Sequence, residues 1–309
     1  MKSSKNDIVD STILKVKPSG ATQKDYFLAN LPQIGYVDFL DFELEKKGKS
    51  KVSISFALTR TGQALSIPNA PFGGFWCEKG VNSDTLENFI LDLQIELKRM
   101  GVNYLKLTQA PKSYEPLSDL INYLLFKLVF NQTLVLSHHF FTGEKKIGKI
   151  LKVEEPKIRK KLKTSQLTAS HGNVESFEFL KHIKQWNSLK RYEVNLDEAQ
   201  LINQVSEYPE RYFLIKLESF DKPVGFALAV KLTSDSIYYF LSALDSTTSI
   251  KNGGDFLLHE LFLLAREQKV DFIDLGSSET KAGVNHSLMF FKSRFANDIS
   301  NKITWEKHL

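Results

Sequence analysis

Cysteine is almost absent from the sequence, since Cys77 is the single one among 309 residues. One cysteine excludes an intrachain disulfide, so a reducing compartment is the simplest interpretation. The neighbours of Cys77 are not those of a catalytic nucleophile, and we expect a small apolar packing role for its thiol.

Long apolar runs are also missing. The most apolar stretch, residues 117–135, is interrupted by Asn122, Lys127, Asn131 and Gln132, so we expect no membrane insertion. The first 24 residues are polar and lack the apolar core of a signal peptide. We therefore expect a cytoplasmic protein, and the sequence sets no oligomeric state.

The sequence offers no metal-binding pattern. His138 and His139 are adjacent in a segment expected to be extended, where successive side chains point to opposite faces and do not chelate one ion. No His pair at helix or turn spacing is accompanied by cysteine or carboxylates. We predict no metal site.

The composition is that of a soluble globular protein, with 42% hydrophobic and 25% charged residues. The length allows two domains of ordinary size. A net charge of +5 permits an anionic substrate but does not require nucleic acid.

Matching segments recur in the same order, about 170 to 180 residues apart, and indicate an internal duplication. The pairs include 56–58 with 226–228, the glycine pairs 73–74 with 253–254, and 101–107 with 269–275. Each copy reads as strand, turn, strand, glycine loop, amphipathic helix and strand. We predict an α/β fold with mixed sheets in two domains, residues 1–145 and 146–309.

The chain is organised around residues 236–295. A β-branched and aromatic strand at 237–241 precedes the loop Asn252-Gly253-Gly254-Asp255, an amphipathic helix over 256–268 and a second apolar strand at 272–275. Glycines at a helix N-terminus let backbone amides approach an anion. The alternative is an ordinary βαβ crossover with a glycine turn.

Four segments together resemble the tandem-GNAT acyltransferases of the FemAB type. They are Pro71-Phe72-Gly73-Gly74, Ile158-Arg159-Lys160-Lys161, residues 252–258, and Asp274-Leu275-Gly276-Ser277 followed by Phe291-Lys292-Ser293-Arg294-Phe295. The resemblance implies two GNAT-like domains covering nearly the whole chain. It also implies transfer of an acyl or aminoacyl group from acyl-CoA or aminoacyl-tRNA to an amine of a cell-wall or polysaccharide precursor.

The resemblance places the donor at Asn252, Gly253, Gly254 and Asp255 of the second copy. Residues 249–254 depart from a full GNAT phosphate loop, and the loop of the first copy lacks that motif altogether, so we expect no donor site there. Because both loops are imperfect, the alternative is a non-catalytic module that binds a cell-wall or polysaccharide precursor or a protein partner.

For catalysis, His286 and Glu279 are the candidates, because they follow the last matched strand, where a cleft would open. Either side chain can take a proton from an attacking amine or orient that amine. The alternative is that both are solvated loop residues.

The predicted substrate-binding residues are mostly basic or lie in the first glycine loop: Pro71, Phe72, Gly73, Gly74, Arg159, Lys160, Lys292 and Arg294. Lys292 and Arg294 suit a phosphate or carboxylate of the acceptor, or else form the polar face of a helix. The basic run over 157–163 suits a nucleotide-sugar diphosphate or a tRNA backbone, or else is a solvated helix face.

Overall fold

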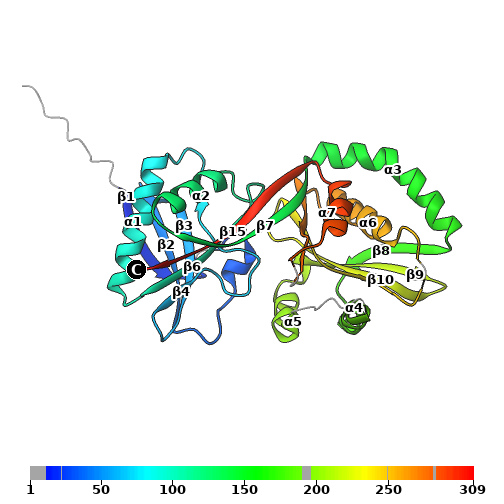
Figure 1. The fold of residues 1–309 in the computed structure, drawn as a ribbon, viewed down its shortest axis with the longest axis horizontal. Helices are drawn as coiled ribbons and strands as arrows, with labels where there is room; N and C mark the ends of the chain where they lie inside the picture. The colour runs from blue at the N-terminus through cyan, green and yellow to red at the C-terminus, as the bar shows by residue number, and fades with distance from the viewer. Residues whose placement is uncertain (1–11, 22, 190–195, 249, 281–282) are drawn as a thin grey trace, which may run out of the picture. The chain divides into compact units, whose positions relative to one another are not determined.

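The computed structural model describes residues 12–21, 23–189, 196–248, 250–280 and 283–309. The chain forms two compact units, residues 1–135 with 301–309 (unit 1) and residues 136–300 (unit 2). The predicted boundary between residues 145 and 146 stays a prediction. The chain passes from one unit to the other within strand β7 (Asn131–Thr142) and again within strand β15 (Asp298–His308) (Figure 1).

Unit 1 is built on a mixed sheet. Its strand order is β1 (Thr12–Pro18), β2 (Asp38–Lys46), β3 (Lys49–Leu58), β4 (Gln63–Leu65), β6 (Tyr104–Gln109), then the ends of β15 and β7. The short strand β5 (Trp76–Cys77) pairs with β3. Helices α1 (Ser83–Arg99) and α2 (Ser118–Lys127) pack on this sheet through one apolar cluster.

The apolar and aromatic residues of segment 26–44 predict one or two helices, and this prediction is wrong. It holds a single 3-10 turn, Phe27–Asn30, and most of β2. Leu40, Phe42 and Leu44 belong to or pack against the apolar cluster, whereas Asp41 and Glu43 alternate to the opposite face. The apolar residues therefore follow the period of a strand.

Unit 2 repeats the plan. Its sheet has the order β7, β12 (Phe272–Ser277), β11 (Ser236–Leu244), β10 (Lys222–Val230), β9 (Tyr212–Ser219) and β8 (Leu167–Asn173). Helix α6 (Gly253–Glu267) covers one face, and α4 (Glu178–Leu189) contacts β10 and β11. Helices α3 (Glu144–Thr164), α5 (Glu198–Glu207) and α7 (His286–Ser293) and the small hairpin β13 (Glu279–Thr280) and β14 (Gly283–Val284) complete the unit.

The same topology in both units supports the predicted duplication. In unit 1, β3 pairs antiparallel with β4, which pairs parallel with β6 across α1. In unit 2, β10 pairs antiparallel with β11, which pairs parallel with β12 across α6. The predicted mixed α/β fold is confirmed.

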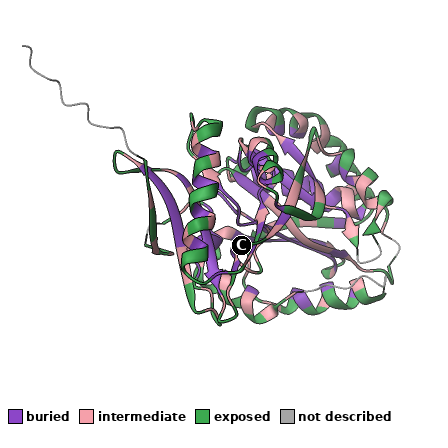
Figure 2. Cartoon of the chain, turned by 60° about the vertical axis from the view of Figure 1, so that its left-hand side comes forward, coloured by how far each residue is buried: buried purple, intermediate pink, exposed green. Residues whose placement is uncertain are grey.

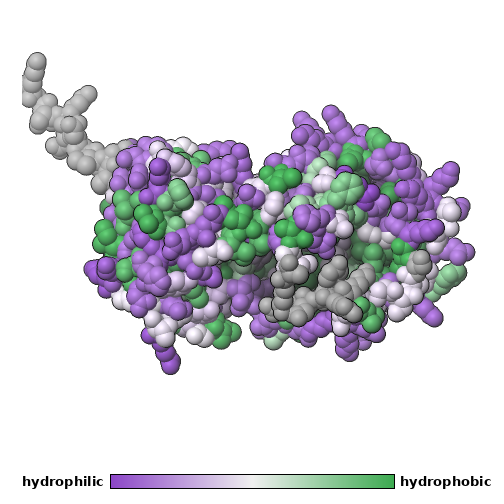
Figure 3. Space-filling view, in the orientation of Figure 1, coloured by the Kyte–Doolittle hydropathy of each residue, from purple (hydrophilic) through white to green (hydrophobic). Residues whose placement is uncertain are grey.

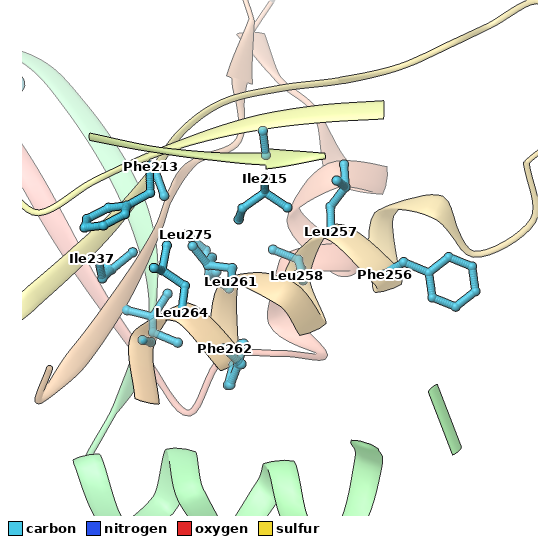
Figure 4. Close-up of a cluster of buried hydrophobic side chains, with 14 of the residues drawn as sticks. Phe213, Ile215, Ile237, Phe256, Leu257, Leu258, Leu261, Phe262, Leu264 and Leu275 are labelled. Carbon is cyan, nitrogen blue, oxygen red and sulfur yellow. The ribbon is translucent and has the colours of Figure 1, made fainter. Parts of the chain in front are cut away.

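The core of unit 2 lies between its sheet and α6. Leu257, Leu261 and Leu264 of α6 point to strands that carry Ile215 and Ile237 (Figure 4). Figure 2 shows that buried residues gather in many of the strands and on one side of several helices. The face turned to the viewer in Figure 3 is mostly hydrophilic, with isolated hydrophobic residues.

Helix α3 holds Pro156 in its interior. Proline removes one backbone hydrogen bond and crowds the preceding turn, which accounts for the change of direction that α3 makes along its length (Figure 1). None of the helices in the described ranges combines the length and the apolar character of a membrane span.

Candidate functional site

The parallel strands β11 and β12 of unit 2 pair over three residues and then separate. Their ladder joins Ser236 to Phe272 and ends at Tyr238 and Asp274. Strand β11 continues to Leu244 alongside β10, and β12 continues to Ser277 alongside β7. Two parallel strands that diverge leave backbone groups between them that a ligand can pair with.

Lys292 of α7 reaches the end of β12. Its Nζ donates to the carbonyl oxygen of Ser277 at 2.5 Å, and the residue is 7% exposed. Burial lowers the pKa of this ammonium to about 8, against the opposing attraction of Asp274. Because an ammonium carries three protons, two remain for further acceptors.

Gly276 makes room for this arrangement. Its φ is +72°, and a Cβ there would lie 3.3 Å from Cε2 of Tyr238 and 3.7 Å from Nζ of Lys292. The Tyr238 hydroxyl would also lie 3.7 Å from that Cβ. Burial, with a contribution from Asp274, raises the pKa of Tyr238, so its hydroxyl stays protonated at neutral pH.

Asp274 is fully buried on β12 and holds His138 of β7. Nδ1 of His138 lies 3.0 Å from each carboxylate oxygen, and Oδ1 of Asp274 also accepts from the backbone N–H of Gly276 at 2.7 Å. Since the carboxylate is the acceptor, Nδ1 of His138 donates this hydrogen bond. The His138 ring stacks beside Tyr238, with 6.3 Å between centroids.

Three buried polar atoms of this region lack a hydrogen-bond partner among the described residues: Nε2 of His138, Nδ1 of His139 and Oγ of Ser278. Burial, followed by the charge of Lys292, lowers the pKa of His139. Unsatisfied buried polar atoms are uncommon in folded proteins and mark places where a ligand or water is expected. We call His138, His139, Tyr238, Asp274, Ser278 and Lys292 the polar cluster.

The loop predicted to bind the donor leads into α6. Asn252 has φ +61° in the left-handed region, and its side chain does not cap the helix. Gly253 is buried against Leu244 and Ile250, and a Cβ on Gly254 would lie 2.9 Å from Cζ of Phe291. Close packing therefore accounts for both glycines, and the Phe291 ring covers one side of the first turn of α6.

Asp255 lies in that first turn and pairs with Arg294, whose Nη2 is 3.1 Å from Oδ1. The guanidinium also lies over the Phe291 and Phe295 rings. Arg294 thus stands beside the helix N-terminus, and Lys292 belongs to the polar cluster, so α7 links the two sites.

The two predicted catalytic residues lie outside the polar cluster. Glu279 is half-buried in β13, and His286 is the exposed first residue of α7. The described structure shows no hydrogen bond or ion pair of either side chain with another, so their catalytic role stays a prediction.

Unit 1 holds the other glycine loop. Phe72, Gly73 and Gly74 are buried, Pro71 is half-buried, and Phe72 stacks on Tyr26 with 4.9 Å between centroids. Gly73 donates to the carbonyl oxygen of Thr108 at 3.0 Å, so the loop runs along β6. A Cβ on Gly74 would come within 2.8 Å of the Cα of Gln109. Packing therefore accounts for these glycines as well.

Arg159 and Lys160 are exposed on α3, where the buried neighbour is Ile158. Arg159 pairs with Glu155 one turn earlier, at 2.5 Å. The basic run is thus a solvated helix face in unit 2, and its contact with a substrate stays a prediction.

Sequence reasoning named Lys292 but missed Asp274, Tyr238 and Ser278, and it treated His138 and His139 only as a failed metal pair. A usable signal was the aspartate inside an otherwise apolar strand, Phe272-Ile273-Asp274-Leu275. A carboxylate there is buried and requires partners. Within the described ranges, no group of three or more His, Cys, Asp or Glu side chains is arranged to hold a metal ion.

No protein-family model matches the chain, and no curated protein matches it in sequence. Solved structures do match its fold. "Crystal structure of FemX" has 12% identity and a TM-score of 0.60, covering 87% of each chain. A conserved protein of unknown function from Bacteroides thetaiotaomicron VPI-5482 has 10% identity and a TM-score of 0.54, covering 86% of this chain and 85% of that one.

A tandem GNAT protein from the clavulanic acid biosynthesis pathway has 8% identity and a TM-score of 0.51, covering 92% of this chain and 87% of that one. These identities show a shared fold and not a shared substrate. The chain has the tandem GNAT-like fold that the structure of FemX also has.

Proposed function

We propose that the protein transfers an acyl or aminoacyl group from a thioester or ester carrier to an amine. The observation that carries the proposal is the buried ammonium of Lys292 at the end of two diverging parallel strands. Among the described residues it makes one hydrogen bond, which leaves two of its protons for further acceptors. Transfer passes through a tetrahedral intermediate with charge on oxygen, and a fixed cation in a dry site stabilises that charge.

In this proposal the amine nitrogen attacks the carbonyl carbon and the carbon–sulfur or carbon–oxygen bond to the carrier breaks. Lys292 donates a hydrogen bond to the carbonyl oxygen as it becomes an oxyanion. The proton lost by the amine goes to solvent or to a substrate group, and in this proposal the protonated hydroxyl of Tyr238 gives one to the leaving group and regains it from solvent. His138 and Asp274 are positioning residues that fix β7 against β12.

The carrier in this proposal is acyl-CoA or aminoacyl-tRNA, bound by its phosphates at Asn252, Gly253, Gly254 and Asp255. The exposed amides of a helix N-terminus favour an anion, and Arg294 adds a cation beside them. We propose an amine of a cell-wall or polysaccharide precursor as the acceptor, and a cytoplasmic location. Support for the carrier class comes from the fold shared with the tandem GNAT protein from the clavulanic acid biosynthesis pathway, a structure solved without AcCoA.

The test separates binding from chemistry. Purified protein is mixed with radiolabelled acetyl-CoA or aminoacyl-tRNA, and both binding and transfer to a panel of amines, including nucleotide-linked amino sugars and muropeptides, are measured. Lys292→Met keeps the length of the side chain and removes the charge. We expect it to bind the carrier within a few-fold of the wild type and to lose roughly 10²–10³-fold in transfer rate.

Ser293→Ala is the matched control, because Ser293 is the exposed neighbour and its hydroxyl donates within α7, to the carbonyl oxygen of Phe290. Its transfer rate should equal that of the wild type. An unchanged rate in Lys292→Met would refute the role of this ammonium.

A second candidate function is a binding module without turnover. The observation that favours it is the Phe291 ring packed onto Gly254, which covers part of the donor loop. In that case the wild type would bind nucleotide-linked amino sugars, raising its melting temperature, but would not be stabilised by CoA thioesters or aminoacyl-tRNA.

A further inference from the structure

A cavity of about 320 Å³ lies in unit 2 between α3, α6 and the residues that follow α7. Figure 4 shows Phe262 on the side of α6 that faces α3, away from the strands. The volume is at the lower end of the range for small-molecule sites.

The apolar walls of this cavity come from α3, α6 and the segment after α7. They are formed by Ile150, Leu151 and Ile158 of α3, Phe262 of α6, and Phe295 after α7. Leu151 is 1% exposed and Phe262 is 3% exposed, so these walls are also part of the core of unit 2. A cavity bounded by core residues keeps its shape and is suited to the apolar body of a ligand.

Four charged residues line the cavity: Glu154, Lys161, Asp255 and Arg294. Glu154 pairs with Lys157 at 2.8 Å, and Asp255 pairs with Arg294 at 3.1 Å. Lys161 has no ion-pair partner within the part of the chain that is described. Both acids are thus compensated, and one positive charge remains.

His259 of α6 also lines the cavity. It is 8% exposed, and its Nε2 has no hydrogen-bond partner among the residues described. Burial lowers the pKa of this imidazole, which therefore stays neutral at physiological pH. A neutral imidazole with an unused nitrogen provides one directional hydrogen bond and no further charge.

The cavity is separate from the polar cluster. Lys292 and Arg294 are two positions apart at the end of α7, and side chains at that spacing point to different sides of a helix. Lys292 reaches Ser277, whereas Arg294 reaches Asp255 and lines the cavity. A molecule in the cavity would therefore lie outside the polar cluster, and it would share Asp255 and Arg294 with the proposed donor site at the start of α6.

We propose that this cavity binds a small amphipathic carboxylate. Its apolar body lies against Ile150, Leu151 and Phe262, and its carboxylate faces Lys161 and Arg294. The apolar walls set the length of ligand that fits, and the uncompensated lysine selects an anion over a cation of the same shape.

The experiment titrates the full chain with octanoate and decanoate by calorimetry. Decanol and decylamine share the apolar body without the carboxylate, and acetate has the carboxylate without that body. We expect saturable binding of a medium-chain carboxylate, weaker binding of decanol, and no binding of decylamine or acetate. Equal binding of decanol and decanoate, or no saturable binding of either acid, would overturn the proposal.

Two variants and one control test where the ligand binds. Lys161→Glu reverses an exposed charge, and we expect at least a roughly fivefold weaker affinity for decanoate. Lys163→Glu changes an exposed lysine of the same helix that does not line the cavity, and it should bind like the wild type. Ile150→Trp fills the cavity from a half-buried position and should abolish binding.

If Ile150→Trp does not fold, as judged by its circular dichroism, the comparison of Lys161→Glu with Lys163→Glu still tests where the carboxylate binds. Equal affinities of Lys161→Glu and Lys163→Glu would show that the carboxylate lies elsewhere. Unchanged binding by a folded Ile150→Trp would show that the apolar body of the ligand lies outside this cavity.

Discussion

The ring of Phe291 packs against the bare Cα of Gly254, so closely that a Cβ on Gly254 would lie 2.9 Å from Cζ of the ring. This contact joins α7, which carries Lys292, to the first turn of α6. A methyl group at position 254 must displace the ring, and the position of α7 depends on that residue.

Gly254→Ala should therefore lower the free energy of unfolding, although alanine favours a helix over glycine by about 1 kcal/mol. In a Phe291→Ala background the clash is absent, so the same Gly254→Ala change should be neutral or stabilising. A double-mutant cycle followed by urea unfolding measures the coupling. Additive effects of the two changes would show that the contact does not exist in solution.

The ammonium of Lys292 should control the pH dependence of transfer. Burial lowers its pKa to about 8, so the charged form that stabilises an oxyanion is lost as the pH rises through that value. We expect kcat of the wild type to fall on the alkaline side with an apparent pKa near 8. Lys292→Arg, which keeps its charge, should lose this limb if it retains measurable activity. An alkaline limb that persists in Lys292→Arg would assign it to another group.

His171 should make the stability of unit 2 depend on pH. Its Nδ1 lies 2.8 Å from Oε1 of Glu260 and its Nε2 lies 2.8 Å from Oε2 of Glu267, so both nitrogens face carboxylates. The hydrogen bond to Glu260, more than the opposing burial, raises the pKa of His171 above its usual 6.5. Stabilisation is then complete below pH 6.5 and disappears as the pH rises through the raised pKa.

The difference in unfolding free energy between the wild type and His171→Gln, measured in urea from pH 5 to 9, should thus be largest at the acid end, at about 1 kcal/mol or more. His286→Gln, at an exposed histidine, is the control and should follow the wild-type curve. A difference that grows toward alkaline pH would contradict the imidazolium assignment.

The pair of Lys24 with Asp41 should matter more than a neighbouring surface pair. The Lys24 Nζ is 2.6 Å from Oδ1 of Asp41, whose side chain is 2% exposed. Lys24→Met leaves a buried carboxylate with the hydroxyl of Ser55 as a remaining partner, and we expect it to cost about 3–5 kcal/mol. Lys15→Met removes the more exposed partner of Glu45 and should cost less than about 1 kcal/mol. Similar midpoints of urea unfolding for the two variants would contradict this order.

The fold was predictable because its evidence is periodic and local. Leu257, Leu261 and Leu264 recur at helix spacing and lie on the buried side of α6. The matched segments in the two halves likewise take the same strand pairings. The prediction of helices in segment 26–44 was wrong because it rested on the number of aromatic residues. It did not use their alternation with Asp41 and Glu43, which is the pattern of a strand.

The site was less predictable because its members are far apart in the sequence. His138 and Asp274 are separated by 136 positions and meet through the pairing of β7 with β12. Glu279 and His286 were chosen for their nearness to a strand end, which does not determine burial or partners. Lys292 was found because the resemblance named its segment, whereas its burial depends on tertiary packing.

The passage of the chain through β7 and β15 restricts how the protein can be divided. Residues 136–300 are continuous and include the part of β7 that pairs with β12, so a fragment with these ends keeps the whole ladder of unit 2. Residues 1–135 alone keep β4 beside β6 but lack the antiparallel partner of β6, because Ile303 to His308 supply it from the C-terminus. Separate production of the first unit therefore calls for a fusion that returns this last strand, whereas excision of the second needs only two cuts.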